Sequence, residues 1–367
     1  MLRTARYLAV RLLALLPLLC PIGCVSSGSS AGLSADRPGP PTVRIGFFPN
    51  VTHAPALLAT GDGSLAKAFG DAAQVEEHVF TAGPAEIEAL FAREIDLGYI
   101  GPGPAVNGFL KSRGKALRII AGSSSGGTAL VARADVKIAS IKDLAGKRVA
   151  VPQTGGTQDI SLRHFLRENG LTPKDRGGQG SSAVEVLQFA PADTLNQFRL
   201  KTVDAAFVPE PWVARLEKET GAGIVLDEKT LWSQGRFSTA VVIVRTEFLE
   251  QHPELVEKFL TAHIRAVRRI RTEPDAARRV IGERIKELNQ GKALPDDILL
   301  SALKRTEITD EPLRDSVLTF ADWARELGYL RQDRTALGDL FADGPLTAAR
   351  AAMAADSKTT SARKVKE

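Results

Sequence analysis

A pair of glycines followed by threonine gives the chain a candidate anion site. Gly155, Gly156 and Thr157 stand where a predicted strand passes into a predicted helix. The first N–H groups of a helix have no partner within it, so a helix start supplies donors and a positive partial charge. Thr154 and Thr157 add hydroxyl donors, and the glycines let the backbone approach a ligand closely. An ordinary loop with an N-cap explains the same residues equally well.

A second polar loop occupies the corresponding place in the first half of the chain. Asn50, Thr52 and His53 follow a predicted strand and precede a predicted helix. The loop is polar between two apolar elements, which favours contact with a ligand. His53 either donates to an anion or caps its own helix.

Five more residues are candidates for ligand contact because they lie in loops or linkers after predicted strands. They are Gly101, Gly103, Ser123, Ser124 and Trp212. The serines could donate hydrogen bonds or simply form a linker, and the indole could wall a cleft or belong to a core.

Glu210 is a candidate of a different kind. A carboxylate repels an anion but attracts an ammonium group. If Glu210 faces the cleft, an amine-bearing ligand such as taurine is favoured, and a salt bridge at the lobe surface is the alternative.

Composition excludes several kinds of chemistry. Cys20 and Cys24 are the only cysteines among 367 residues, so the body has no thiol nucleophile and no cysteine-based metal site. The histidines follow no HExxH or HxxxH spacing. We therefore expect no catalytic residue, no cofactor and no metal. The net charge of +5 comes from the two ends of the chain, so nucleic acid is not an expected partner.

The N-terminus has the pattern of an export signal. Basic residues precede a short apolar run, and Ile22-Gly23-Cys24 precedes a Ser/Gly/Pro-rich stretch. This pattern predicts a signal peptide at 1–23, lipidation of Cys24 and a flexible tether at 24–41. Pro21 departs from the usual aliphatic residue of a lipobox, and plain secretion is the alternative.

The body is predicted to contain two copies of one α/β plan. Pro84-Ala85-Glu86 corresponds to Pro191-Ala192-Asp193, and the strand at 95–100 corresponds to the strand at 203–208. Strands alternate with helices in both halves, which predicts mostly parallel sheets with ligand loops at the strands' carboxyl ends.

Two crossings, near 127 and 238, would join the copies and make a hinge. We therefore expect a division of the chain into a first lobe, a second lobe, a return to the first lobe with C-terminal helices, and a basic, disordered tail. The corresponding ranges are 42–127, 128–238, 239–343 and 344–367.

Four segments resemble the substrate-binding proteins of ABC importers, in particular the group that binds nitrate, sulfonates, taurine and thiamine precursors. They are 44–54 (RIGFFPNVTHA), 94–104 (EIDLGYIGPGP), 141–150 (IKDLAGKRVA) and 203–211 (VDAAFVPEP). The resemblance covers about 43–270 and implies a two-lobe, periplasmic-binding-protein-like fold of type II.

The resemblance also implies a function without catalysis. The chain would capture a small anion such as a sulfonate, taurine or nitrate, and deliver it to ABC permease and ATPase subunits. It would act as a monomer in the periplasm or on the extracytoplasmic surface of the membrane, held by its lipid. A ligand sensor for a membrane kinase and a binder of a thiamine pyrimidine precursor are the alternatives.

Overall fold

The computed structural model describes residues 39–175, 177 and 180–364. The predicted signal peptide, Cys24 and nearly all of the tether lie outside the described residues. Within the described part of the chain, no helix has both the length and the apolar composition that crossing a bilayer requires.

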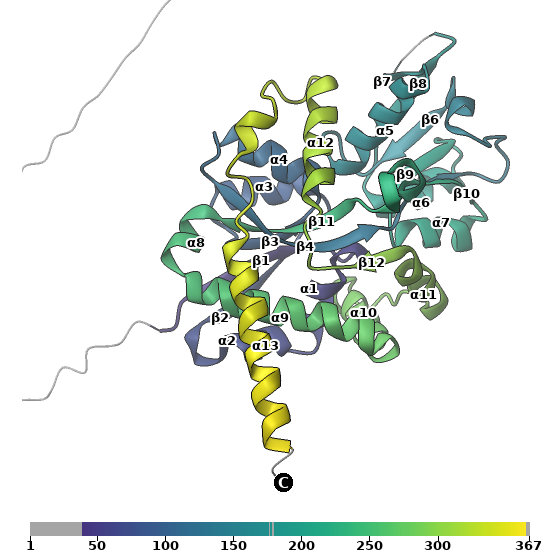
Figure 1. Ribbon diagram of the computed structural model, residues 1–367. Coiled ribbons are helices and arrows are strands. Elements are labelled where there is room, and N and C mark those ends of the chain that lie inside the picture. The colour runs from purple at the N-terminus through teal and green to yellow at the C-terminus, as the bar shows by residue number, and fades with distance from the viewer. Residues whose placement is uncertain (1–38, 176, 178–179, 365–367) are drawn as a thin grey trace, which may run out of the picture. The chain divides into compact units, whose positions relative to one another are not determined.

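Sheet A has six strands (Figure 1). One end of the sheet is parallel: β1 (Thr42–Phe47) lies between the edge strand β2 (Gln74–Val79) and β3 (Leu97–Ile100). Beyond β3 the order continues with β11 (Ser238–Arg245), β4 (Leu117–Gly126) and β12 (Thr306–Ile308), each antiparallel to its neighbour.

Sheet B repeats this plan with residues from the middle of the chain. The parallel strands are β9 (Ala205–Pro209), β6 (Arg148–Val151), β8 (Ala183–Gln188) and β7 (Thr172–Lys174). β5 (Thr128–Ala132) pairs with β9, and β10 (Gly223–Asp227) pairs with β5, each antiparallel to its neighbour. The order β4-β11-β3-β1-β2 thus matches β10-β5-β9-β6-β8.

The expectation of mostly parallel sheets is confirmed for sheet B, where three of the five strand pairings are parallel. It is wrong for sheet A, where three of the five pairings are antiparallel. Both sheets are therefore mixed. The reason lies in the two connections between them. β5 and β11 each follow a segment that has come from the other sheet. They therefore enter at the carboxyl edge of the parallel strands and run against them.

Helices cover both faces of sheet A. One face carries α1 (Ala54–Gly61), α2 (Ser64–Phe69), α9 (Pro253–Thr272), α10 (Pro274–Leu288) and α11 (Asp296–Arg305). The other face carries α3 (Gly83–Phe91), α4 (Pro102–Lys111) and α12 (Arg314–Glu326). The short α8 (Thr246–Gln251) follows β11. We call sheet A with these helices the first lobe.

Sheet B is covered in the same way. On one face lies α5 (Thr157–Glu168), and on the other lie α6 (Pro191–Arg199) and α7 (Trp212–Thr220). We call this unit the second lobe. Short 3-10 turns complete the described elements: Val51–His53, Gly70–Ala72, Ile141–Leu144, Glu228–Leu231, Ser233–Gly235 and Arg334–Leu337.

Proline marks the starts of many helices. α3, α4, α6, α9 and α10 each carry one within their first two residues. A proline there removes an N–H that has no partner within the helix, and its fixed φ suits helical backbone. The helix starts predicted at Pro84, Pro102 and Pro191 are found.

The chain passes from sheet A to sheet B through Gly126 and Gly127. Both have positive φ, at 72° and 71°, a conformation that suits glycine. A side chain on Gly127 would also meet the Thr306 hydroxyl. The chain returns to sheet A at Ser238, and we propose the lobe ranges 42–127, 128–238 and 239–343 from these crossings.

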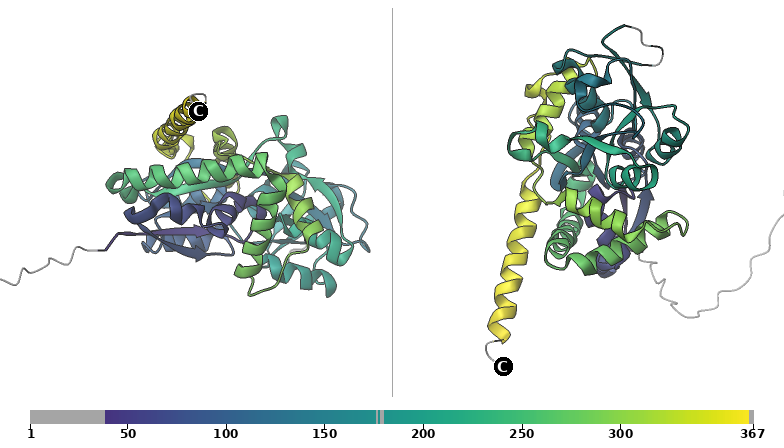
Figure 2. Two further views of the ribbon diagram at one scale, coloured as in Figure 1. Left: turned by 90° about the horizontal axis from the view of Figure 1, so that it is seen from below. Right: turned by 90° about the vertical axis from the view of Figure 1, so that its right-hand side faces the viewer.

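The segment predicted to be a disordered tail is helical instead. α13 (Gly344–Lys364) begins on the first lobe and continues beyond it (Figures 1 and 2). Leu346, Ala349 and Met353 are buried in the core that includes α9. These apolar residues are spaced three and four apart, so they form one helical face, which the count of basic residues did not reveal.

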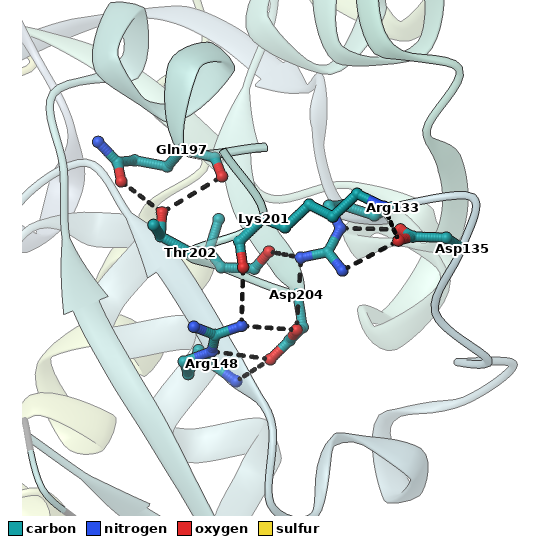
Figure 3. A network of polar contacts seen from close by, with 8 residues as sticks. Arg133, Asp135, Arg148, Gln197, Lys201, Thr202 and Asp204 are labelled. Carbon is teal, nitrogen blue, oxygen red and sulfur yellow. Dashed lines mark hydrogen bonds and ion pairs between the residues drawn. The ribbon is translucent and has the colours of Figure 1, made fainter. Parts of the chain in front are cut away.

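One carboxylate in each lobe ties three neighbouring strands together at the sheet edge where the parallel strands start and the antiparallel strand ends. Asp204, just before β9, accepts from the Arg148 backbone N–H (2.8 Å) and from the Nε and Nη2 groups of its guanidinium (both 3.2 Å). Arg133, just after β5, approaches the same carboxylate at 3.5 Å. Figure 3 shows Asp204 between these two arginines.

The first lobe repeats the arrangement. Asp96 accepts from the Arg44 backbone N–H (3.0 Å) and from its guanidinium, and Arg245 donates to Asp96 at 2.8 Å. The aspartates belong to the segments from which the sequence predicted an internal repeat. This shared geometry supports the interpretation that the two lobes are copies of one plan.

We expect Asp204→Ala to lower the free energy of unfolding by about 3 kcal/mol, because it removes the acceptor that the Arg148 backbone N–H and guanidinium share. Urea unfolding measures the change. Asp135→Ala is the control, since Asp135 bonds to Arg133 at the exposed rim of the same network, and it should change stability little. Equal losses from both variants would contradict a special role for Asp204.

The pH dependence of the Asp204→Ala effect has a definite sign. Burial acts to raise the pKa of Asp204, but the hydrogen bonds and charge of Arg148 outweigh it, and the pKa is lowered. The carboxylate therefore stabilises the fold fully above its unfolded pKa of about 3.9 and loses this contribution as the pH falls through the folded value. The difference between wild type and variant should shrink in acid.

Candidate functional site

A cavity of about 40 Å³ lies between the two sheets, at the edge of each sheet where the parallel strands end. This volume suits a few water molecules or a small ion. The first lobe contributes Phe48, Asn50, Thr52, His53, Thr81, Ala82, Gly83, Pro84, Gly101, Pro104 and Thr239. The second lobe contributes Pro152, Gln153, Gly156, Thr157, Gln158, Pro191 and Pro209.

The cavity wall combines polar and apolar side chains, and its described residues carry no formal charge at neutral pH. No Asp, Glu, Lys or Arg is among its lining residues in the described part of the chain. Eight of these residues have polar side chains that can donate a hydrogen bond: Asn50, Thr52, His53, Thr81, Gln153, Thr157, Gln158 and Thr239. Such a wall can bind oxygen atoms through neutral donors.

Four helices begin at this cavity. The first residues of α3, α4, α5 and α6, or the residues just before them, line it. Each helix start carries a positive partial charge of about half an elementary charge. Prolines remove N–H groups from the starts of α3, α4 and α6, whereas α5 begins with Thr157-Gln158-Asp159 and keeps its N–H groups.

The starts of α4 and α5 meet across the lobes. The Gly103 N–H donates to the Thr157 hydroxyl at 3.3 Å. A Cβ added to Gly101 would lie 2.2 Å from Thr157 Oγ1, and one added to Gly103 would lie 3.2 Å from Thr157 Cα. The glycines therefore allow two positive helix ends to come close, an arrangement that an anion between them would stabilise.

His53 is a neutral hydrogen-bond donor. Its Nδ1 accepts from the Phe48 backbone N–H at 3.1 Å, so the proton of the neutral ring is on Nε2. Burial lowers the pKa of His53 to about 3. The Phe48 ring stacks on the imidazole with the ring centres 4.4 Å apart. In the described part of the chain the side chain makes no capping bond to α1, so the capping alternative fails.

The structure brings six of the sequence candidates together at the cavity: Asn50, Thr52, His53, Gly101, Gly156 and Thr157. Gly103 is next to it through the bond to Thr157. Gly155 has a φ of 74° and donates its N–H to Asp159 Oδ2 at 2.9 Å. We call residues 154–157 the glycine loop.

Three other candidates do not line the cavity. Ser123 is buried and donates to the Thr52 carbonyl at 3.0 Å, so it supports the loop from behind. Ser124 is also buried, and its hydroxyl has no partner among the described residues. Thr154 is exposed at the outer end of the glycine loop, and its N–H donates to Gln188.

Glu210 does not face the cavity, so it offers no support for an amine-bearing ligand. It is fully buried, accepts from the Ala214 N–H at 3.1 Å and pairs with Arg305 of α11. Burial raises the pKa of Glu210, partly opposed by the nearby Arg305. The pair joins the second lobe to a first-lobe helix. Glu210 therefore forms a salt bridge, as the alternative expected, but a buried one and not one at the lobe surface.

Trp212 does not wall the cavity either. Its Nε1 donates to Asn50 Oδ1 at 3.1 Å, a hydrogen bond between the lobes. The Arg215 guanidinium lies 4.8 Å from the centre of its ring. Trp212 therefore orients a cavity residue and does not itself reach the ligand space.

Several cavity residues were not predicted. Thr81, Gly83, Pro191 and Pro209 follow or end β2, β8 and β9, and the rule of carboxyl-end loops could have identified them. Gln153 and Gln158 flank the predicted glycine loop. Thr239 lies within β11, and no sequence signal distinguishes it from its neighbours. No group of three His, Cys, Asp or Glu among the described residues could hold a metal ion.

We expect Gly101→Ala to weaken ligand binding about 5- to 150-fold without unfolding the protein. The new methyl group would clash with Thr157 only when the lobes meet, and overpacking costs about 1–3 kcal/mol. Calorimetric titration measures the affinity. Gly223→Ala is the control, because an added Cβ there has no described atom within 4 Å. Unchanged affinity in Gly101→Ala would rule out this contact as part of the bound state.

The chain resembles proteins with known or proposed binding roles. It is 26% identical over 218 residues to a protein of Brucella abortus (strain 2308) described as a binding protein, a match of 59% of this chain and 63% of that one. It is 26% identical over 283 residues to the taurine-binding periplasmic protein of Escherichia coli, covering 75% of this chain and 83% of the relative.

Two solved structures show the shared fold. The alkanesulfonate-binding protein SsuA from Xanthomonas axonopodis aligns with a TM-score of 0.64 and 20% identity, over 79% of this chain and 93% of its own. The nitrate-binding protein NrtA from Synechocystis aligns with a TM-score of 0.70 and 16% identity, over 85% and 89%. The predicted two-lobe, periplasmic-binding-protein-like α/β fold is confirmed.

The family assignment rests on the sequence itself. The NMT1-like family model matches residues 36–286, which contain both lobes' parallel strands and every residue that lines the cavity. The chain therefore belongs to the NMT1-like family.

Proposed function

We propose that this protein is the substrate-binding component of an ABC importer and captures a small oxyanion between its two lobes. The observation that carries the proposal is the convergence of four helix starts and seven neutral donors on one cavity. The eighth polar side chain, Thr239, already donates to the Gly126 carbonyl. The ligand would be held without covalent chemistry, and the protein would pass it to a membrane permease and its ATPase.

Closure of the lobes would depend on the ligand because of the helix dipoles. The starts of α4 and α5 are in contact through Gly103 and Thr157. Their positive ends oppose each other, so a monoanion between them favours the closed state. Binding energy is thereby used for closure, which is the event that a transporter can detect.

The ligand class follows from the wall. Sulfonates and nitrate present oxygen acceptors and one negative charge, which match neutral donors and helix starts. Because no carboxylate is among the described lining residues, a ligand ammonium group would be buried without a counterion, at high cost. We therefore propose a sulfonate or nitrate that lacks an amine, although a relative is named for taurine.

Location and anchoring belong to the same proposal. We propose that the protein works on the outer side of the membrane, as a monomer, with lipid on Cys24. The support for this is the export pattern at 1–23 and the names of periplasmic relatives. Loss of labelled-lipid incorporation in Cys24→Ala would support the anchor, and retained incorporation would contradict it.

A ligand panel tests the proposed function. Methanesulfonate or nitrate at 100 times its dissociation constant should add about 2.7 kcal/mol to the free energy of unfolding, and taurine should add much less. Thr157→Val should weaken binding about tenfold, because it removes a cavity hydroxyl. Thr154→Val is the matched control on the exposed end of the glycine loop. If no anion in the panel raises the free energy of unfolding, the proposal is contradicted.

Affinity should not change between pH 5 and pH 8. The pKa of His53 is lowered to about 3 by burial, so the ring stays neutral throughout this range. If the anion needed an imidazolium, binding would strengthen about tenfold for each unit of pH decrease above that pKa. Titrations at pH 5, 6.5 and 8 distinguish the two cases, and a tenfold rise toward acid would contradict a neutral donor.

A further inference from the structure

We infer that Tyr329 is a positioning residue that couples closure of the lobes to the conformation of the glycine loop. It acts through the buried carboxylate of Asp159 and does not itself line the cavity. The inference rests on the proposed function, because it concerns how the same cavity gains its affinity.

Tyr329 is held rigidly on the first lobe. It follows α12, whose end is marked by Gly328 with a φ of 84°. The Tyr329 N–H donates to the Ala324 carbonyl at 2.8 Å, the bond expected of a Schellman turn. The next residue, Leu330, is buried in the first-lobe core. The direction of the phenol is therefore set by the first lobe.

Asp159 is the receiving group on the second lobe. It lies in the first turn of α5, and its side chain is completely buried. Oδ1 accepts from Arg163 Nε at 2.6 Å. Oδ2 accepts from two donors, the Tyr329 hydroxyl at 2.6 Å and the Gly155 N–H at 2.9 Å. One oxygen atom thus joins a first-lobe residue to the glycine loop of the second lobe.

The coupling follows from the cost of burying a carboxylate. The Asp159 side chain is completely buried, so each donor that is missing leaves a lone pair unsatisfied. The closed state is favoured only when both Tyr329 and Gly155 donate, and Gly155 can do so only in its positive-φ conformation. That conformation places Gly156 and Thr157 against the cavity.

Two contacts between α-helices of the two lobes lack this property. Trp323 of α12 stacks on His164 of α5 with ring centres 4.2 Å apart, an apolar contact that does not involve the glycine loop. Lys218 of α7 pairs with Asp297 of α11 at 3.0 Å, where both side chains are largely exposed. These contacts favour closure in general, whereas Tyr329 favours one loop conformation.

The test compares Tyr329→Phe with Asp297→Asn in the intact mature chain. Stopped-flow and calorimetry with methanesulfonate and nitrate give the rate constants and affinities. Amide hydrogen exchange at Gly155 in the ligand-saturated protein reports the loop. We expect Tyr329→Phe to bind about tenfold more weakly, through faster dissociation, with faster exchange at Gly155. Asp297→Asn should stay within twofold of wild type, and both variants should melt like wild type without ligand.

Each other outcome overturns a defined part of the argument. Wild-type affinity in Tyr329→Phe contradicts the inference. Weaker binding with unchanged exchange at Gly155 makes Tyr329 a simple closure contact, as does an equal loss in Asp297→Asn. Premature melting of Tyr329→Phe without ligand assigns the residue to the fold itself. If wild type binds neither anion, the proposed function fails first, and the inference fails with it.

Discussion

A carboxylate that joins neighbouring strands at one edge of each sheet is the interaction on which the rest of the structure depends. Asp96 and Asp204 each bind the strand that starts beside them and an arginine on the antiparallel strand beyond. Because two parallel strands are joined at their amino ends to the end of an antiparallel strand, the carboxyl ends of the parallel strands emerge at set spacings. The loops at that edge therefore hold their positions, although the cavity itself contains no charged pair.

The cavity works by geometry and partial charge. Its donors are helix starts, hydroxyls, amides and one neutral imidazole, all of which keep their state over a wide pH range. Two glycines let the opposing helix starts touch, and charged pairs lie away from the ligand space, as Glu210 with Arg305 does. A separation of this kind allows strong structural ion pairs without fixing a countercharge beside the ligand.

Sequence reasoning succeeded where position along the chain determines position in space. Loops after parallel strands meet at one edge, so Asn50, His53 and Thr157 could be identified. It failed where side-chain direction decides the role. Glu210 and Trp212 lie in such a loop, but Glu210 accepts from Arg305 of α11 and Trp212 donates to Asn50. Nothing in the sequence marked Thr239 in β11, and burial of one α13 face was hidden among basic residues.

The two crossings of the chain between the lobes have a consequence for its synthesis. Sheet B is built entirely from residues between Thr128 and Asp227, whereas sheet A needs β11, which ends at Arg245, to join β3 to β4. A ribosome therefore releases every strand of the second lobe before the first lobe has its central strand. The first lobe therefore completes its sheet after the second lobe, although its first strands are made earlier. Until β11 is made, the unpaired edges of β3 and β4 are open to other partners.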